Sequence, residues 1–121
     1  MEARYVFAVT FRLEPEPGVG LDPDTFETRL SRPAATPGEA GWRFFRDNLW
    51  RGEIADRDHF REITEAAIGA TVLDVDYRFF EADEEYLTAL RESIAADLAD
   101  FKDDSVERVS TKYFGSSIEV A

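Results

Sequence analysis

Alternating apolar and polar residues predict strands in three stretches of the chain. Residues 4–13 alternate with a two-residue period, so one face of a predicted strand is apolar. The residues on that face are Tyr5, Phe7, Val9, Phe11 and Leu13. Residues 70–81 repeat the pattern, with Leu73, Val75, Tyr77 and Phe79 facing inward and Asp74, Asp76 and Arg78 facing outward. A final strand or hairpin is predicted over 106–120, around Val109, Thr111 and Tyr113 and interrupted at Gly115.

Two longer stretches have the three-to-four-residue spacing of an amphipathic helix. The first runs from after Asp56 to about Ile68 and ends at Gly69, a typical stop residue. Its predicted inner stripe is Phe60, Ile63 and Ala67. The second covers 83–101, with an inner stripe of Leu87, Leu90, Ile94, Leu98 and Phe101.

A shorter helix is predicted after the loop at 14–21. Asp22-Pro23-Asp24 reads as a helix start, and Phe26 and Leu30 are one turn apart on the same face. Phe26, Thr28 and Leu30 also alternate, which leaves a strand as the alternative. Residues 33–41 form a predicted loop.

Residues 42–54 fit two structures. Asp47-Asn48 can form the turn of a hairpin between two short aromatic strands. The capping-box pattern from Thr36 to Glu39 would instead start a helix that runs to Gly52. We favour the hairpin, because glycines weaken that helix start and closely spaced aromatic residues favour strands.

The order of these elements predicts the fold class. The first six are β-α-β-β-α-β, the ferredoxin-like arrangement, and an αβ extension follows at the C-terminus. We therefore expect one α+β domain over residues 1–121, with helices packed on one face of an antiparallel sheet.

The net charge of the chain indicates the solvent to which the protein is adapted. The chain has 26 acidic and 14 basic residues, a net charge of −12, and its only lysines are Lys102 and Lys112. Such a surface repels itself in dilute salt, whereas molar salt shortens the Debye length to about 3 Å. The composition is therefore typical of a salt-adapted protein. Cysteine is absent, which excludes disulfides and thiolate sites, and we expect a cytoplasmic location without membrane contact.

One segment departs from this acidic background. Residues 42–52 contain both tryptophans and three arginines against one aspartate. Arginine presents a planar fork to anions and stacks on aromatic rings. The candidate binding residues are Trp42, Arg43, Arg46, Leu49, Trp50 and Arg51. A purely structural role, with the rings in the core and the arginines paired to acids, is the alternative.

The same segment resembles a known family. Leu49-Trp50-Arg51, within FFRDNLWRGEI, and the closing KYFGSSIEV are similar to the LWR-salt proteins of halophilic archaea. That resemblance implies a salt-rich archaeal cytoplasm and supplies no activity.

These observations lead us to expect a non-enzymatic accessory protein. It would bind a protein partner, or a second copy of itself, through residues 42–52. RNA binding through Phe44, Phe45, Phe79 and Phe80 is the alternative, although the acidity opposes it. A small enzyme or receptor for an anionic ligand is the third possibility. The sequence predicts no catalytic residues, no metal site and no cofactor.

Overall fold

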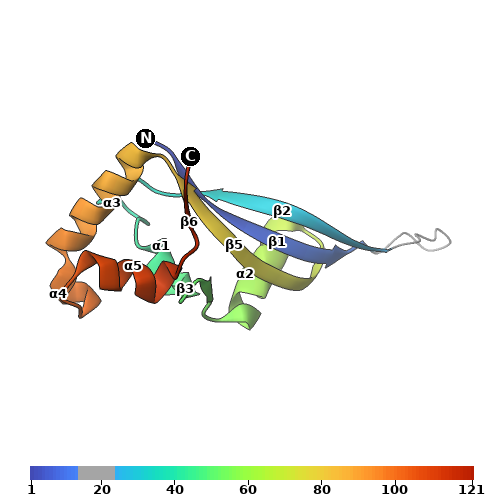
Figure 1. Cartoon of the computed structure of the whole chain (residues 1–121). Coiled ribbons are helices and arrows are strands. Elements are labelled where there is room, and N and C mark those ends of the chain that lie inside the picture. The colour runs from blue at the N-terminus through green and yellow to red at the C-terminus, as the bar shows by residue number, and fades with distance from the viewer. Residues whose placement is uncertain (14–23) are drawn as a thin grey trace.

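A four-stranded, mostly antiparallel sheet is the centre of the computed structural model, which describes residues 1–13 and 24–121 (Figure 1). The strand order is β2-β1-β5-β6, with β1 antiparallel to both neighbours and β5 parallel to β6. These strands are β1 (Ala3–Arg12), β2 (Thr25–Pro33), β5 (Thr71–Ala82) and β6 (Ile118–Val120). The predicted α+β class is confirmed, but the second element is a strand, so the ferredoxin-like order is not found.

The helices gather on one side of this sheet and around one of its ends (Figure 1). They are α1 (Phe44–Asn48), α2 (Arg57–Ile68), α3 (Glu84–Ala96), α4 (Leu98–Phe101) and α5 (Val106–Phe114). A small separate hairpin, β3 (Leu49–Trp50) and β4 (Glu53–Ile54), follows α1.

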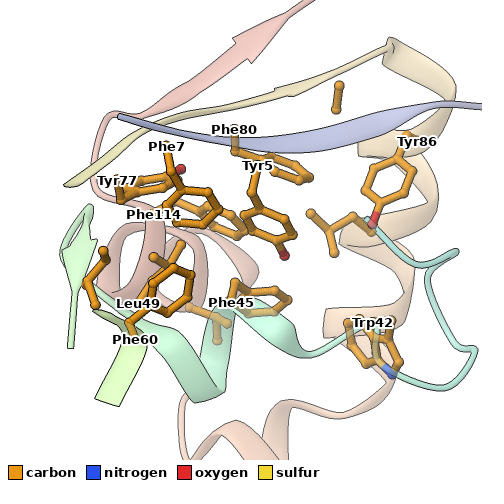
Figure 2. Close-up of a cluster of buried hydrophobic side chains, with 14 of the residues drawn as sticks. Tyr5, Phe7, Trp42, Phe45, Leu49, Phe60, Tyr77, Phe80, Tyr86 and Phe114 are labelled. Atoms are coloured by element: carbon orange, nitrogen blue, oxygen red, sulfur yellow. The ribbon is translucent and has the colours of Figure 1, made fainter. Parts of the chain in front are cut away.

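Aromatic side chains fill the space between the sheet and the helices (Figure 2). Phe80 of β5 lies 4.8 Å from Tyr5 and 5.0 Å from Phe114, measured between ring centroids. Phe45 of α1 lies 4.9 Å from Phe114, and all four rings are almost wholly buried. Each such pair contributes about 0.5–1.5 kcal/mol beyond burial of its area. This cluster fixes α1 and α5 against the sheet.

The short helix predicted around Phe26 and Leu30 is wrong, because these residues belong to strand β2. Phe26 faces Phe11 and Leu30 faces Phe7 across the β1–β2 pair. Their shared face therefore comes from strand alternation, which the sequence had left as the alternative. The predicted loop at 14–21 and the helix-start residues Asp22 and Pro23 lie outside the described residues.

The strand predicted over 106–120 is also wrong in its first part, which forms helix α5. Ser105 caps this helix, because its side chain accepts a hydrogen bond from the Arg108 N–H. Val106, Val109 and Tyr113 pack in or against the core, and their separations of three and four residues are helical. Only Ile118–Val120 form a strand, β6.

The long helix predicted over 83–101 is interrupted at Asp97, which has non-helical backbone angles. The chain therefore forms α3 and a separate turn, α4. This break brings Phe101 to within 6.0 Å of Trp42, so the aromatic core extends to the end of the domain.

Strand β5 is correct in position, but two β-bulges shift its alternation. Leu73 and Arg78 have no partner in the register with β1, and each bulge moves the following side chains to the opposite face. As a result Phe80 is buried in place of Phe79, and Leu73 is exposed. The inward positions of Val75 and Tyr77 are confirmed.

Helix α2 confirms its prediction, including its end at Gly69, which has a left-handed conformation. Phe60 is buried as expected, whereas Ile63 and Ala67 are exposed. On β1, Tyr5, Phe7 and Val9 are buried as expected, but Leu13 is 41% exposed. In both α2 and β1 the apolar stripe is longer than the surface that neighbouring elements cover, so its remaining residues are exposed.

Candidate functional site

The hairpin β3–β4 lies against the C-terminal end of helix α5. Its turn is formed by Arg51 and Gly52, whereas Asp47 and Asn48, the predicted turn, belong to helix α1. The N–H of Arg51 donates to the carbonyl of Lys112 at 2.7 Å, and the N–H of Gly52 donates to that of Tyr113 at 2.9 Å. The last carbonyls of a helix lack partners within the helix, so this turn caps α5.

The two chain segments approach each other too closely for side chains at two glycines. A Cβ atom on Gly52 would lie 2.9 Å from the carbonyl oxygen of Phe114. A Cβ atom on Gly115 would lie 3.0 Å from the carbonyl oxygen of Arg51. Both glycines also have positive φ angles, as does Arg51 itself, at 52°. A left-handed conformation costs a non-glycine residue about 1–2 kcal/mol, which the cap interactions offset here.

Part of the predicted binding segment is internal. Trp42 is 8% exposed and Leu49 is 1% exposed, and both belong to the hydrophobic core. Trp42 meets the rings of Phe45 and Phe101 edge-on. The burial of these two side chains is the arrangement that the structural alternative describes.

Arg43 and Arg46 also interact within the chain. Arg43 donates to the carboxylates of Asp97 and Asp100, and its guanidinium lies 5.2 Å from the centre of the Trp42 ring. The hydrogen bond to Asp97 is the main reason that the pKa of Arg43 is raised. Arg46 lies 3.4 Å from the carboxylate of its neighbour Asp47. Arg43 therefore joins α1 to the α3–α4 junction.

Trp50 and Arg51 are the part of the segment that faces outward. Trp50 is 46% exposed, and its ring meets Tyr113 edge-on at 6.1 Å. The guanidinium of Arg51 lies 5.6 Å from the centre of the Trp50 ring, a cation–π distance. Within the described part of the chain, no carboxylate lies within ion-pairing distance of Arg51.

An open groove of about 640 Å³ runs between this pair and helix α5. Its charged and aromatic lining is Trp50, Arg51, Asp103, Glu107, Arg108 and Lys112. We call this surface the Trp50–Arg51 groove. Three cations and two acids line it, so it is locally positive in a chain of net charge −12.

Two of the groove cations have partners. Lys112 lies 3.0 Å from Asp103, and its hydrogen bond is the main cause of the lowered pKa of that carboxyl. Arg108 lies 3.5 Å from Asp104, with both side chains largely exposed, so this contact is weak. Arg51 is thus the cation best placed to receive an outside anion.

The groove residues on α5 were not predicted as part of a site. Thr111 and Lys112 were assigned to a strand, which would have placed them away from Trp50. The signal that could have located them is Ser105 as a helix cap, followed by Val106 and Val109 at helical spacing. With α5 recognised as a helix, Lys112 falls near its C-terminal end, where a capping segment is required.

Comparison with known families identifies the chain. The LWR-salt protein family model matches residues 1–121. The chain belongs to this family. No curated protein matches it, and no solved structure does. In this LWR-salt protein the three residues of the motif Leu49-Trp50-Arg51 have different positions. Leu49 packs in the core, Trp50 lies at the groove, and the backbone of Arg51 caps α5.

One further finding concerns the helices of this LWR-salt protein. In residues 1–13 and 24–121, none is both long enough and apolar enough to cross a bilayer.

Proposed function

We propose that this protein is a non-enzymatic accessory protein that binds an acidic segment of a partner protein in the Trp50–Arg51 groove. The exposure of Trp50 carries the proposal, because a 46% exposed tryptophan beside a cation is suited to contact with a partner. Tryptophan and arginine are the residue types most enriched where protein interfaces gain their affinity.

The geometry of the pair supports this function. Trp50 is held from behind by Tyr113, whose ring lies 5.6 Å from Phe45 in the core. A side chain supported in this way loses little conformational entropy on binding. Because the turn that carries Arg51 is bonded to helix α5, its side chain starts from a fixed backbone.

The charge of the groove supports an acidic occupant. Arg51 can present two N–H groups to one carboxylate, and this bidentate geometry strengthens the hydrogen bonds. A partner segment with an apolar residue beside a carboxylate could contact Trp50 and Arg51 at once. The open shape of the groove is better suited to a chain segment than to an enclosed small molecule.

Salt determines where such binding would occur. An acidic partner is repelled at long range by a net charge of −12, and molar salt removes most of that repulsion. The short-range burial of Trp50 and the contact with Arg51 persist. We therefore place the function in a salt-rich cytoplasm, in agreement with the acidic composition.

RNA binding has less support from the positions of its proposed residues. Phe45 and Phe80 are completely buried, and Phe44 is covered by the guanidinium of Arg32, 4.3 Å from its ring centre. Base stacking needs exposed rings on one surface. Phe79 is the only one of the four proposed rings on the outer face of the sheet.

Site-specific photocrosslinking tests the proposal. A photoreactive aromatic amino acid is placed at Trp50, and a control is placed at Leu73, which is similarly exposed but lies on β5. Both proteins are irradiated in a lysate of the producing cells at about 2 M KCl, where long-range repulsion is screened. We expect position 50 to yield a discrete adduct with an acidic partner segment that position 73 does not. Identical adducts from both positions, or none, would count against the groove.

A further inference from the structure

Strand β2 leaves one side of the sheet open. It is hydrogen-bonded only to β1, and the structure assigns it no second neighbour within the described residues. Every residue of β2 is exposed except Leu30, which is partly buried. A nine-residue edge of this kind is a template for another strand.

The hydrogen bonds at both ends of β2 show which backbone groups are free. The N–H of Leu13 donates to the carbonyl of Asp24 at 3.0 Å, and the N–H of Ala34 donates to that of Ala3 at 2.9 Å. In an antiparallel pair, bonding direction alternates along the strand. Even-numbered residues of β2 therefore bond to β1, and odd-numbered residues direct their N–H and C=O groups to the free edge. Pro33 is odd-numbered and has no N–H, so pairing at that edge stops there.

The charges of β2 are complementary to those of a second β2 in one antiparallel register. With a two-fold axis at Thr28, Glu27 of each copy faces Arg29 of the other. Asp24 then faces Arg32 in the same way. Axes at Glu27 or Arg29 would instead place like charges opposite each other. The register at Thr28 also places the odd-numbered residues in hydrogen-bonded pairs, as the free edge requires.

The apolar residues agree with this register. Phe26 of one copy would face Leu30 of the other, on the side of the sheet where the helices lie. A groove of about 400 Å³ opens beside Leu30, between β2 and helix α2, and Phe60 and Ile63 contribute to its lining. Phe26 is 36% exposed and Ile63 is 38% exposed in the single chain. Pairing would cover both side chains.

From these observations we infer that β2 binds β2 of a second copy, forming a two-fold symmetric homodimer with one continuous sheet. The contacts are isologous, so each favourable pair occurs twice. Two copies of charge −12 repel each other in dilute salt. Molar salt screens this long-range repulsion strongly. It screens the contacts between side chains on facing strands less, because their Cβ atoms lie only about 5 Å apart. The dimer therefore forms in concentrated salt.

A charge exchange between Glu27 and Arg29 tests the register. The molar mass of the full chain is measured by analytical ultracentrifugation at about 1 M KCl, a concentration at which long-range repulsion is screened. We expect the wild type to have twice the monomer mass, whereas Glu27→Arg and Arg29→Glu each give monomers. An equimolar mixture of the two variants restores charge pairing at every position and should return to the dimer mass. The double variant Glu27→Arg/Arg29→Glu should also dimerise.

Circular dichroism and thermal melting show that each variant is folded before its mass is interpreted. A wild type that remains monomeric would overturn the inference, as would single variants that dimerise like the wild type. Monomers in the mixed sample would exclude this register. Trp50→Ala should dimerise like the wild type, since its groove is a different surface, so the outcome is independent of the proposed partner binding.

Discussion

The backbone N–H of Arg51 donates to the carbonyl oxygen of Lys112, 2.7 Å away, while the Arg51 side chain lies beside the exposed ring of Trp50. One residue thus has two separable parts. Its backbone closes the end of helix α5, and its guanidinium is available at the groove. This separation allows the architecture of the motif and its proposed binding role to be tested independently.

The close approach of the hairpin to α5 predicts a large effect of Gly52→Ala. The added Cβ would meet the carbonyl oxygen of Phe114 at 2.9 Å, and the positive φ adds strain. We expect a loss of about 2–4 kcal/mol in the free energy of unfolding, measured by denaturant titration. Gly69→Ala is the matched control, because Gly69 also has a positive φ but no atom within 4 Å of the added Cβ. It should cost only about 1 kcal/mol; equal losses would show that the contact with α5 is not tight.

The division of the motif predicts that its smaller apolar residue matters more for stability. Leu49 is 1% exposed and Trp50 is 46% exposed. Leu49→Ala should cost about 2–5 kcal/mol, because it leaves a cavity in the core. Trp50→Ala loses only its contacts on one side and should cost about 1–2 kcal/mol. If Trp50→Ala proves the more destabilising change in parallel titrations, Trp50 is a core residue and not a binding residue.

The elements with a single strong pattern were predictable from the sequence. Strand β1 and helix α2 have one period each, and α2 has both a cap residue, Asp56, and a stop residue, Gly69. The α+β class follows from these elements. The motif Leu49-Trp50-Arg51 was also recognised as distinct from its acidic surroundings.

The sequence predictions were wrong where two periodic patterns overlap or where pairing with a distant segment of the chain determines the structure. Val109, Thr111 and Tyr113 alternate, but Val106, Val109 and Tyr113 have the helical spacing with which α5 packs against the core. Phe26, Thr28 and Leu30 fit a strand as well as a short helix, and pairing with β1 decides for the strand. The bulges at Leu73 and Arg78 depend on the register with β1. The sequence did not show that Trp42 is buried and Trp50 is exposed, because Trp50 lies against Tyr113 of α5, a helix that was predicted as a strand.

Acid should lower the contribution of Asp103, in the loop that leads into α5, to the stability of the folded state. Hydrogen bonding from Lys112 lowers the pKa of the Asp103 carboxyl below its usual 3.8. A lowered pKa means that this carboxylate stabilises the folded state above pH 3.8 and loses that effect as the pH falls through the folded-state pKa. The free-energy difference between wild type and Asp103→Asn, from titrations between about pH 7 and pH 2, should stay constant above about pH 5 and shrink below pH 3.8. A difference independent of pH would contradict the pairing with Lys112.

Folding should depend on salt. A net charge of −12 is unscreened in dilute solution, and screening raises the stability of the compact state. The melting temperature should therefore rise when KCl increases from about 0.1 M to about 3 M. Sodium chloride at matched ionic strength controls for a specific effect of potassium. An unchanged melting temperature would refute salt adaptation of this surface.

The most direct test of the proposed function is competition by Arg51→Gly. Arg51 has a φ of 52°, so glycine removes the guanidinium while relieving backbone strain and keeping the N–H that caps α5. Its unfolding free energy should stay within about 1 kcal/mol of the wild type. Unlabelled wild type should suppress the partner adduct formed at position 50, and Arg51→Gly at the same concentration should fail to suppress it. Equal suppression by the two proteins would contradict a binding role for the Arg51 side chain and, with it, the account of the groove.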